Sequence, residues 1–225
     1  MPLTIAIDGP VGAGKSTISD AVAKSLNILH LDTGAMYRAV GLGVLDLNTD
    51  PEDEEKVVSL LTDGKIIVDV KYEDGQQVTL LNGVSVNDRI RTQEAGGAAS
   101  TVSRYPGVRR AMVRLQQALA EKCPMLLDGR DIGTVVLPNA TAKIYLTASV
   151  KIRAGRRMEQ LREKGDMTPF EDILREVEAR DWQDTHRETD PLRQAEDAVL
   201  VDSGSLSFEE TVESILKIVR EKYHG

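Results

Sequence analysis

Short apolar runs alternate along this chain with longer stretches in which apolar residues recur at helical spacing. Each run has the length of a buried β-strand. The runs occupy residues 3–8, 28–31, 124–128, 142–147 and 198–202. A regular alternation of strands and helices predicts an α/β fold, in which helices flank a parallel sheet.

The pattern changes in residues 65–87, where apolar and polar residues alternate one by one. The alternating segments are residues 66–72, 78–80 and 84–86. They are separated by Asp74-Gly75 and Asn82-Gly83, dipeptides typical of tight hairpin turns. We therefore predict a three-stranded antiparallel meander inserted in the α/β chain. Helical spacing resumes at about residues 91–103 and 106–122.

A glycine-rich loop follows the first apolar run and precedes a predicted helix from Lys15 to about Leu26. The backbone N–H groups of such a loop surround phosphate oxygens, its lysine reaches the β- and γ-phosphates, and its serine hydroxyl binds Mg²⁺. The helix N-terminus adds positive potential. The loop reads Gly9-Pro10-Val11-Gly12-Ala13-Gly14-Lys15-Ser16-Thr17. A chance glycine turn is the alternative, but strand and helix are both where the motif requires them, so we predict a nucleoside triphosphate site.

Polar side chains also follow the second and third apolar runs. Thr33, Tyr37 and Arg38 follow the second run, and Arg130 and Asp131 follow the third. Because ligands of open α/β sheets bind at the carboxyl ends of the strands, we expect these side chains and the glycine-rich loop to line one crevice. For Tyr37 and Arg38 the alternative is ordinary packing with solvated tips.

The composition narrows the class of nucleotide-binding protein. The chain has 225 residues, a formal net charge of -8 and a single cysteine, Cys123. The acidic balance argues against broad nucleic-acid binding, and one cysteine excludes an intramolecular disulfide. The Asn-Lys-x-Asp tetrapeptide of common GTPases does not occur. No apolar run is long enough to span a membrane and the first residues lack a signal-type pattern, so we expect a cytoplasmic protein.

Five segments, in this order, resemble the bacterial cytidylate kinase family of P-loop kinases over essentially the whole chain. They are GPVGAGKST, LDTGAMYRA, TQEAGGAAS, DGRDIGTVV and RDWQDTHRETDPL. The resemblance implies one kinase unit, residues 1–225, with a five-stranded parallel sheet and a short lid. It also implies transfer of a phosphoryl group from ATP to CMP or dCMP. The implied regions are a core at about 1–35, 105–150 and 188–225, a nucleoside monophosphate-binding region at about 36–104 with the meander at 65–87, and a lid at about 151–187.

Arginines are what such a transfer needs, because two polyanionic nucleotides must be brought together. Arg38 and Arg130 can each bind the acceptor phosphate through two parallel hydrogen bonds. Arg153, Arg156 and Arg157 share one side of a predicted helix, from which they would close over the transferring group. The residues expected to act in catalysis are Lys15, Arg38, Arg130, Arg153 and Arg157. A solvated helix face is the alternative for the arginines at 153–157.

The start of that helix departs from the family pattern. Lys151 and Ile152 stand where the family often has acidic residues. Loss of carboxylates from a first helical turn should weaken the helix N-terminus, because anions are favoured there. The departure bears on the stability of the lid and leaves the predicted chemistry unchanged.

The resemblance assigns ten residues to the acceptor CMP. They are Thr33, Tyr37, Arg38, Ser100, Arg109, Arg130, Asp131, Arg180, Asp184 and Arg187. Arg180 and Asp184 should contact the pentose, and Asp131 should accept a hydrogen bond from the cytosine amino group, which a carboxylate recognises. Two alternatives stay open. Asp131 could serve only to hold Arg130, and Arg180 and Asp184 could be a surface ion pair on a helix from about residue 169 to 186.

Mg²⁺ carried by ATP is the implied cofactor, with Ser16 as its expected ligand and Asp128, at a strand end, as an outer-shell ligand. We expect a monomer with ATP and CMP or dCMP as ligands and with no nucleic-acid or membrane partner. Two other classes of protein stay open. A shikimate- or gluconate-type P-loop kinase would not need the meander or base-reading residues, and a nucleotide-binding switch would bind ATP without turnover.

Overall fold

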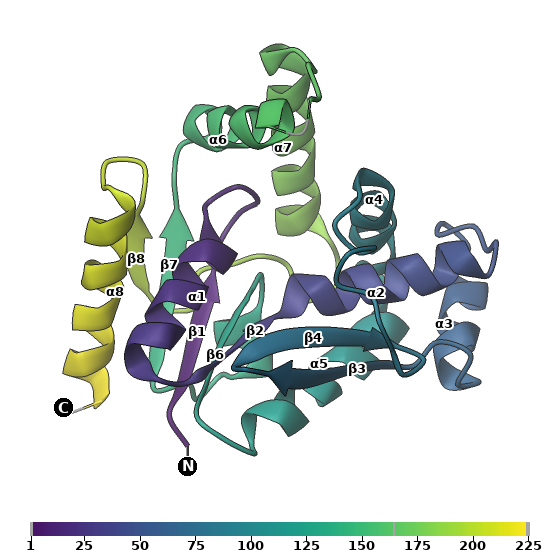
Figure 1. The fold of residues 1–225 in the computed structure, drawn as a ribbon, viewed down its shortest axis with the longest axis horizontal. Coiled ribbons are helices and arrows are strands. Elements are labelled where there is room, and N and C mark those ends of the chain that lie inside the picture. Colours follow the sequence, from purple (N-terminus) through teal and green to yellow (C-terminus); the bar gives the residue numbers. More distant parts are fainter. Residues whose placement is uncertain (1, 164, 224–225) are drawn as a thin grey trace. The chain divides into compact units, whose positions relative to one another are not determined.

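The computed structural model describes residues 2–163 and 165–223. These residues form two compact units. The meander unit comprises Pro2 and Leu29–Met125, and the P-loop unit comprises Leu3–Ile28 and the chain from Leu126 onward. Figure 1 gives the course of the chain through both.

The P-loop unit carries the strands and helices that flank the glycine-rich loop. Its elements are β1 (Thr4–Asp8), α1 (Lys15–Leu26), β6 (Met125–Gly129), the π-helical turn η1 (Ile132–Val136), β7 (Ala142–Thr147), α6 (Val150–Glu163), α7 (Phe170–His186), β8 (Val199–Asp202) and α8 (Phe208–Tyr223). The meander unit contains β2 (Leu29–Asp32), α2 (Thr33–Asp46), α3 (Glu54–Thr62), β3 (Val68–Glu73), β4 (Gln76–Leu81), β5 (Val84–Ser85), α4 (Gln93–Val102) and α5 (Pro106–Ala120).

The larger sheet has five strands in the order β2-β6-β1-β7-β8. β1 pairs in parallel with β7, and β7 pairs in parallel with β8. In this register Ile7 lies opposite Ile144, and Asp8 lies opposite Tyr145. The predicted parallel sheet flanked by helices is therefore confirmed.

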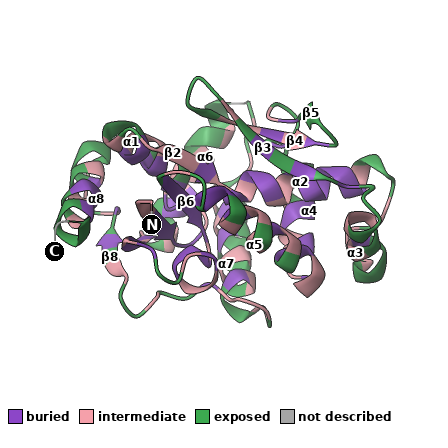
Figure 2. Ribbon diagram, turned by 90° about the horizontal axis from the view of Figure 1, so that it is seen from below, coloured by how far each residue is buried: buried purple, intermediate pink, exposed green. Residues whose placement is uncertain are grey.

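The two faces of β1 and β7 have different chemistry, because successive side chains of a strand point to opposite faces. Ile5, Ile7, Ile144 and Leu146 belong to a hydrophobic core that also contains buried residues of α1 and α8. In Figure 2 the buried residues of α8 are purple and alternate with exposed residues in green. Asp8 follows Ile7 on β1, so its side chain lies on the opposite face of the strand and points away from that core.

A second, small core lies within α6 and α7. Its fully buried members are Ala154, Ile173 and Val177, and partly buried residues pack against them. One of these is Val11 of the glycine-rich loop. Figure 1 shows α6 and α7 beyond the carboxyl end of β7. The pair thus rests on the loop that follows β1.

The meander unit contains the predicted antiparallel sheet, in the order β3-β4-β5. Both predicted turns form as expected, because each has two successive residues with positive φ, as a type I′ turn requires. The φ values are 50° and 76° at Asp74 and Gly75, and 50° and 80° at Asn82 and Gly83. The meander is therefore confirmed.

Helices α2 and α4 of the meander unit pack closely. A Cβ built on Gly41 of α2 would lie only 2.7 Å from the backbone nitrogen of Ala99 on α4, so only glycine allows this approach. Among the helices of residues 2–163 and 165–223, none is both long enough and apolar enough to cross a bilayer.

Candidate active site

The glycine-rich loop has the strand and helix that its motif requires. β1 ends at Asp8 and α1 begins at Lys15. A Cβ built on Gly9 would lie 1.9 Å from the carbonyl oxygen of Leu146, so the loop leaves β1 in direct contact with the backbone of β7. The first turn of α1 offers free N–H groups at the end of the loop, the arrangement that binds phosphate in other proteins.

Lys15 is folded into the loop. Its Nζ donates to the carbonyl oxygens of Gly9 and Pro10, both at 2.8 Å. Burial, followed by the guanidinium of Arg130, lowers the pKa of Lys15 to about 7. The carboxylates of Asp128 and Asp184 act in the opposite direction. A phosphate group beside Nζ would add the negative charge that favours the ammonium form.

Ser16 and Asp128, the two expected Mg²⁺ ligands, lie side by side. The Ser16 hydroxyl donates to the Asp128 carboxylate across 3.0 Å, although 112 residues separate them in the chain. A hydroxyl and a carboxylate are oxygen donors of the type Mg²⁺ prefers. Among the described residues there is no group of three acidic, histidine or cysteine side chains that could hold a metal. The hydroxyl of Ser16 and the carboxylate of Asp128 are thus a donor pair that fits Mg²⁺.

Arg130 is oriented by an ion pair with Asp184. Its Nε donates to the Asp184 carboxylate at 2.7 Å, and Nη1 donates to the carbonyl of Gly129 at 3.2 Å. Burial opposes ionisation of Asp184, but Arg130 and, to a smaller extent, Arg187 favour it, so the pKa of Asp184 lies below its ordinary value. Arg180 lies close enough to lower this pKa further. The carboxylate that holds Arg130 is therefore that of Asp184.

Asp131 pairs with Arg187. Nη2 of Arg187 lies 3.7 Å from the Asp131 carboxylate, and both side chains are almost fully buried. Arg187 also donates through Nε to the carbonyl of Asp190 at 2.8 Å. Asp131 and Arg187, both assigned to the acceptor CMP by the resemblance, are thus brought together, whereas Arg130 pairs with Asp184.

Asp8 was not among the predicted site residues. It is buried at the end of β1, and its carboxylate accepts hydrogen bonds from the backbone N–H groups of Ile132 and Gly133 at 2.8 and 2.7 Å. Burial raises the pKa of Asp8 to about 7. An acidic residue directly before the glycine-rich loop could have marked Asp8 as a site residue. The backbone groups that it binds lie more than 120 residues away in the sequence, so its contacts could not be predicted.

The lid arginines differ in their surroundings. Arg153 is buried, pairs with Asp181 at 2.6 Å and donates to the carbonyls of Ala148 and Val11. Arg156 is half-buried and donates to the carbonyl of Ser203 at 2.7 Å. Arg157 is half-buried and lies near the half-buried Asp166, whose pKa is lowered first by hydrogen bonds from Thr168 and further by Arg157. A fully solvated helix face, the alternative for this cluster, does not describe Arg153 or Arg156.

The unusual start of α6 is accommodated by two contacts. The hydroxyl of Ser149 accepts from the N–H of Ile152 at 3.4 Å, which caps the helix in place of an acid in the first turn. Ile152 also reaches the loop after β8, since a Cβ built on Gly204 would lie 3.0 Å from its Cδ1. The helix therefore forms without the carboxylates common in the family.

Five predicted acceptor residues lie in the meander unit. Thr33 is buried at the start of α2, just after Asp32, whose carboxylate accepts from the N–H of Ala35 at 3.0 Å. The guanidinium of Arg109 lies 5.7 Å from the ring centre of Tyr37, a cation–π contact. Arg38 is half-buried on α2, and Ser100 lies on α4, the helix packed against α2.

The predicted residues thus fall into two groups, one in each unit. Those in the P-loop unit are Gly9, Pro10, Val11, Gly12, Ala13, Gly14, Lys15, Ser16, Thr17, Asp128, Arg130, Asp131, Arg153, Arg157, Arg180, Asp184 and Arg187. Those in the meander unit are Thr33, Tyr37, Arg38, Ser100 and Arg109.

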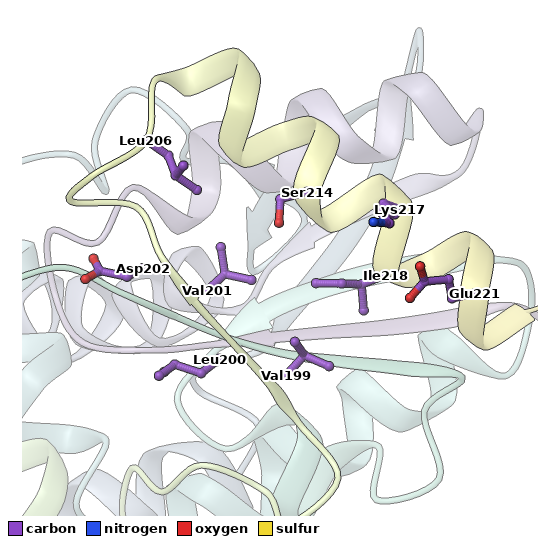
Figure 3. Close-up of a pocket in the computed structure, with 9 residues that line it drawn as sticks. All are labelled: Val199, Leu200, Val201, Asp202, Leu206, Ser214, Lys217, Ile218 and Glu221. Atoms are coloured by element: carbon purple, nitrogen blue, oxygen red, sulfur yellow. The ribbon is translucent and has the colours of Figure 1, made fainter.

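A pocket of about 350 Å³ lies elsewhere in the P-loop unit, between β8 and α8. Figure 3 shows its lining, in which Leu200, Leu206 and Ile218 are accompanied by Lys217 and Glu221. None of the predicted site residues lines it.

Comparisons with known proteins identify similar chains. Residues 5–221 match the family described as cytidylate kinase. A cytidylate kinase of Caldicellulosiruptor bescii is 48% identical over 96% of this chain and 95% of its own length. A cytidylate kinase of Bacillus subtilis is 46% identical over 98% of this chain and 97% of its own. An uncharacterized protein of Eubacterium ventriosum has a similar fold, with a TM-score of 0.51 at 12% identity over 97% of this chain and 98% of that one.

Proposed function

Because this chain belongs to the cytidylate kinase family, we propose that it transfers the γ-phosphoryl group of ATP to CMP or dCMP. The products are ADP and CDP or dCDP. The full-length similarity to curated cytidylate kinases carries this proposal. The arrangement of cationic side chains in the P-loop unit supports it, because phosphoryl transfer depends chiefly on positioning and charge neutralisation.

Lys15 and the arginines have distinct proposed roles. Lys15 would leave the carbonyls of Gly9 and Pro10 for the β- and γ-phosphates, where charge develops during transfer. Arg130, oriented by Asp184, and Arg38 would bind the acceptor phosphate. Arg153 and Arg157 would act from the lid. No base is needed, because the acceptor phosphate is already ionised at neutral pH.

Mg²⁺ would neutralise charge on the donor phosphates when it is bound. Ser16 would be its protein ligand and Asp128 an outer-shell partner, as their 3.0 Å contact supports. The glycine-rich loop, residues 9–17, would hold the phosphates through its backbone N–H groups.

Asp131 and Arg187 would select the base. Cytosine presents an amino donor where uracil presents an oxygen, so a carboxylate favours cytosine. Thr33 and Ser100 would add hydroxyl contacts, and Arg109 would donate to the acceptor side of the ring. Arg180 and Asp184 would contact the pentose, and Tyr37 would line the site.

We also propose a monomer that acts in the cytoplasm and needs no nucleic-acid or membrane partner. The division into a core, a CMP-binding region and a lid, as given by the family resemblance, is part of the same proposal. Sedimentation should give a species near the chain mass of 24.6 kDa; a dimer would contradict the monomer without affecting the proposed reaction.

An acceptor panel tests the proposed reaction directly. ADP formation from ATP would be measured with AMP, GMP, TMP, UMP, CMP and dCMP, and with shikimate and gluconate. We expect the highest kcat/KM with CMP and dCMP. Turnover of shikimate or gluconate in place of CMP would instead identify a different small-molecule kinase. ATP binding without turnover of any acceptor would indicate a nucleotide-binding switch.

A further inference from the structure

The carboxylate of Asp8 forms hydrogen bonds with the backbone directly after Arg130 and Asp131. Asp8 is 4% exposed and is the last residue of β1, directly before Gly9. Its Oδ1 accepts from the N–H of Ile132 at 2.8 Å, and its Oδ2 accepts from the N–H of Gly133 at 2.7 Å. The two oxygens of this carboxylate thus accept hydrogen bonds from two successive backbone N–H groups.

These two backbone N–H groups belong to the first two residues of the π-helical turn η1. The carbonyl of Asp131 accepts from the N–H groups of both Val135 and Val136, at 2.9 and 3.2 Å. The N–H of Leu137 then reaches the carbonyl of Ile132 at 2.7 Å, the five-residue spacing of a π-helix. The N–H groups of Ile132 and Gly133 therefore lie free of the turn itself, as at any helix start. Asp8 supplies their acceptors.

The turn lies against Asp8 of β1 and Lys143 of β7. A Cβ built on Gly133 would lie 3.4 Å from Asp8 Oδ2 and 3.1 Å from Cδ of Lys143. Lys143 is itself fixed, since its Nζ donates to the carbonyl of Pro138 at 2.6 Å and to Asp197 at 2.8 Å. A side chain at position 133 would thus be tight against Lys143 and in ordinary van der Waals contact with Asp8.

We propose that Asp8 is a positioning residue that holds the acceptor-binding segment in register with the phosphate loop. This inference rests on the proposed kinase function. Asp8 is bonded covalently to Gly9 of the donor site and by two hydrogen bonds to the residues that follow Arg130 and Asp131. A misplacement of about 1 Å can lower the rate of such a transfer a hundredfold.

Substitution of Asp8 separates positioning from general stability. Asp8→Ala leaves two buried N–H groups without acceptors, so the turn must shift. We expect kcat with CMP to fall about a hundredfold, while the Kd of ATP from calorimetry stays within about threefold of wild type. The preference for CMP over UMP should also fall, because Asp131 moves with the turn. A role in folding alone would lower Tm without changing this preference.

Asp8→Asn gives a milder variant that keeps the shape of the side chain. Its amide offers one acceptor oxygen but turns an NH₂ donor toward the second N–H group. We expect kcat and the CMP preference to lie between those of wild type and Asp8→Ala. If Asp8→Ala does not fold, Asp8→Asn alone tests the positioning role. A kcat and a CMP preference equal to those of wild type in Asp8→Asn would overturn the proposal.

Asp53→Ala is a matched control for lost stability. Asp53 also accepts a backbone hydrogen bond through its carboxylate, from Lys56 N at 3.1 Å, but it caps α3 in the meander unit. Its loss should lower Tm and leave kcat and base preference at wild-type values. The proposal would be overturned if Asp53→Ala and Asp8→Ala changed kcat equally at equal stability.

Amide hydrogen exchange separates this proposal from that of the reaction itself. In Asp8→Ala the amides of Ile132 and Gly133 should exchange faster than in wild type, while those of Asn27 and Ile28, which bond to α1 carbonyls, should not. Unchanged exchange at residues 132 and 133 would overturn the positioning role. Absence of CMP turnover in wild type, with faster exchange in the variant, would instead overturn the proposed reaction alone.

Discussion

Nε of Arg130 and a carboxylate oxygen of Asp184 lie 2.7 Å apart, which joins the segment after β6 to the last turns of α7. The pair is mostly buried, with side-chain exposures of 21% for Arg130 and 9% for Asp184. An arginine that uses Nε within the protein retains N–H groups on its terminal nitrogens for a ligand. The guanidinium is therefore already oriented for the acceptor phosphate that we propose it binds.

Removal of the Asp184 carboxylate should weaken the binding of CMP and leave the binding of ATP nearly unchanged. In Asp184→Ala the buried Arg130 loses a charge-assisted hydrogen bond, a loss of about 1.5–3 kcal/mol, so KM for CMP should rise roughly tenfold to a hundredfold. KM for ATP should change little. Steady-state kinetics with CMP and dCMP measure both constants.

The two acceptors separate the possible roles of Asp184. Support of Arg130 predicts the same factor for CMP and dCMP, because their phosphates are alike, whereas direct contact with the pentose predicts different factors. Asp172→Ala is the matched control, since Asp172 forms an exposed ion pair with Arg175 on the same helix. Equal increases of KM for ATP and CMP in Asp184→Ala would contradict both roles.

Lys15→Ala should reduce kcat by two or more orders of magnitude with little effect on CMP binding. The ammonium group follows charge that develops between the β- and γ-phosphates, and removal of one such electrostatic contact typically costs a factor of about 10²–10³. Lys24→Ala, which removes an exposed lysine of the same helix, serves as the control. A near-normal kcat in Lys15→Ala would contradict the assignment of the glycine-rich loop as the ATP site.

The buried Lys15 should make the free protein more stable as the pH rises above neutrality. Its pKa is lowered from 10.5 to about 7, so between these values the unfolded chain binds a proton that the folded chain does not. The unfolding free energy therefore increases with pH across this window. Urea titrations at about pH 8 and about pH 10 should show a smaller increase for Lys15→Met than for wild type. An equal increase in both would show that Lys15 titrates normally.

Asp131→Ala should lower kcat/KM for CMP more than for UMP. Each unmet hydrogen bond in a site built for one pattern costs about 1–3 kcal/mol, and only cytosine loses a partner in this variant. A fall by equal factors for both acceptors would favour a structural role for Asp131 through its contact with Arg187. Efficient use of UMP by wild type would contradict the selectivity altogether.

Local signals in the sequence predict much of this fold. Glycine and asparagine at the two turns of the meander allow the positive φ that the structure adopts there, so turn type and strand order follow directly. The helix predicted to run from Lys15 to about Leu26 has those bounds, because Gly14 and Asn27 terminate it in left-handed conformations. In such segments the information lies within a few neighbouring residues.

The pairings that orient the candidate site are less accessible to sequence. Arg130 was predicted to bind phosphate, but its partner Asp184 lies 54 residues away and carries no local mark of the contact. The π-helical turn at Ile132–Val136 depends on Asp8, whose side chain is supplied by a different strand. Spacing rules for helices and strands do not describe such long-range contacts, so this part of the site emerges only from the three-dimensional arrangement.

Val11 and Gly12 connect the glycine-rich loop to α6 and α7, the helices of the proposed lid. Val11 packs into the small core of α6 and α7, and a Cβ built on Gly12 would lie 3.1 Å from Cβ of Arg153. Because packed side chains cannot separate without opening a void, a change in the shape of the loop must be passed to α6 by direct contact. The loop proposed to hold the donor phosphates is therefore also the surface against which the proposed lid helices pack.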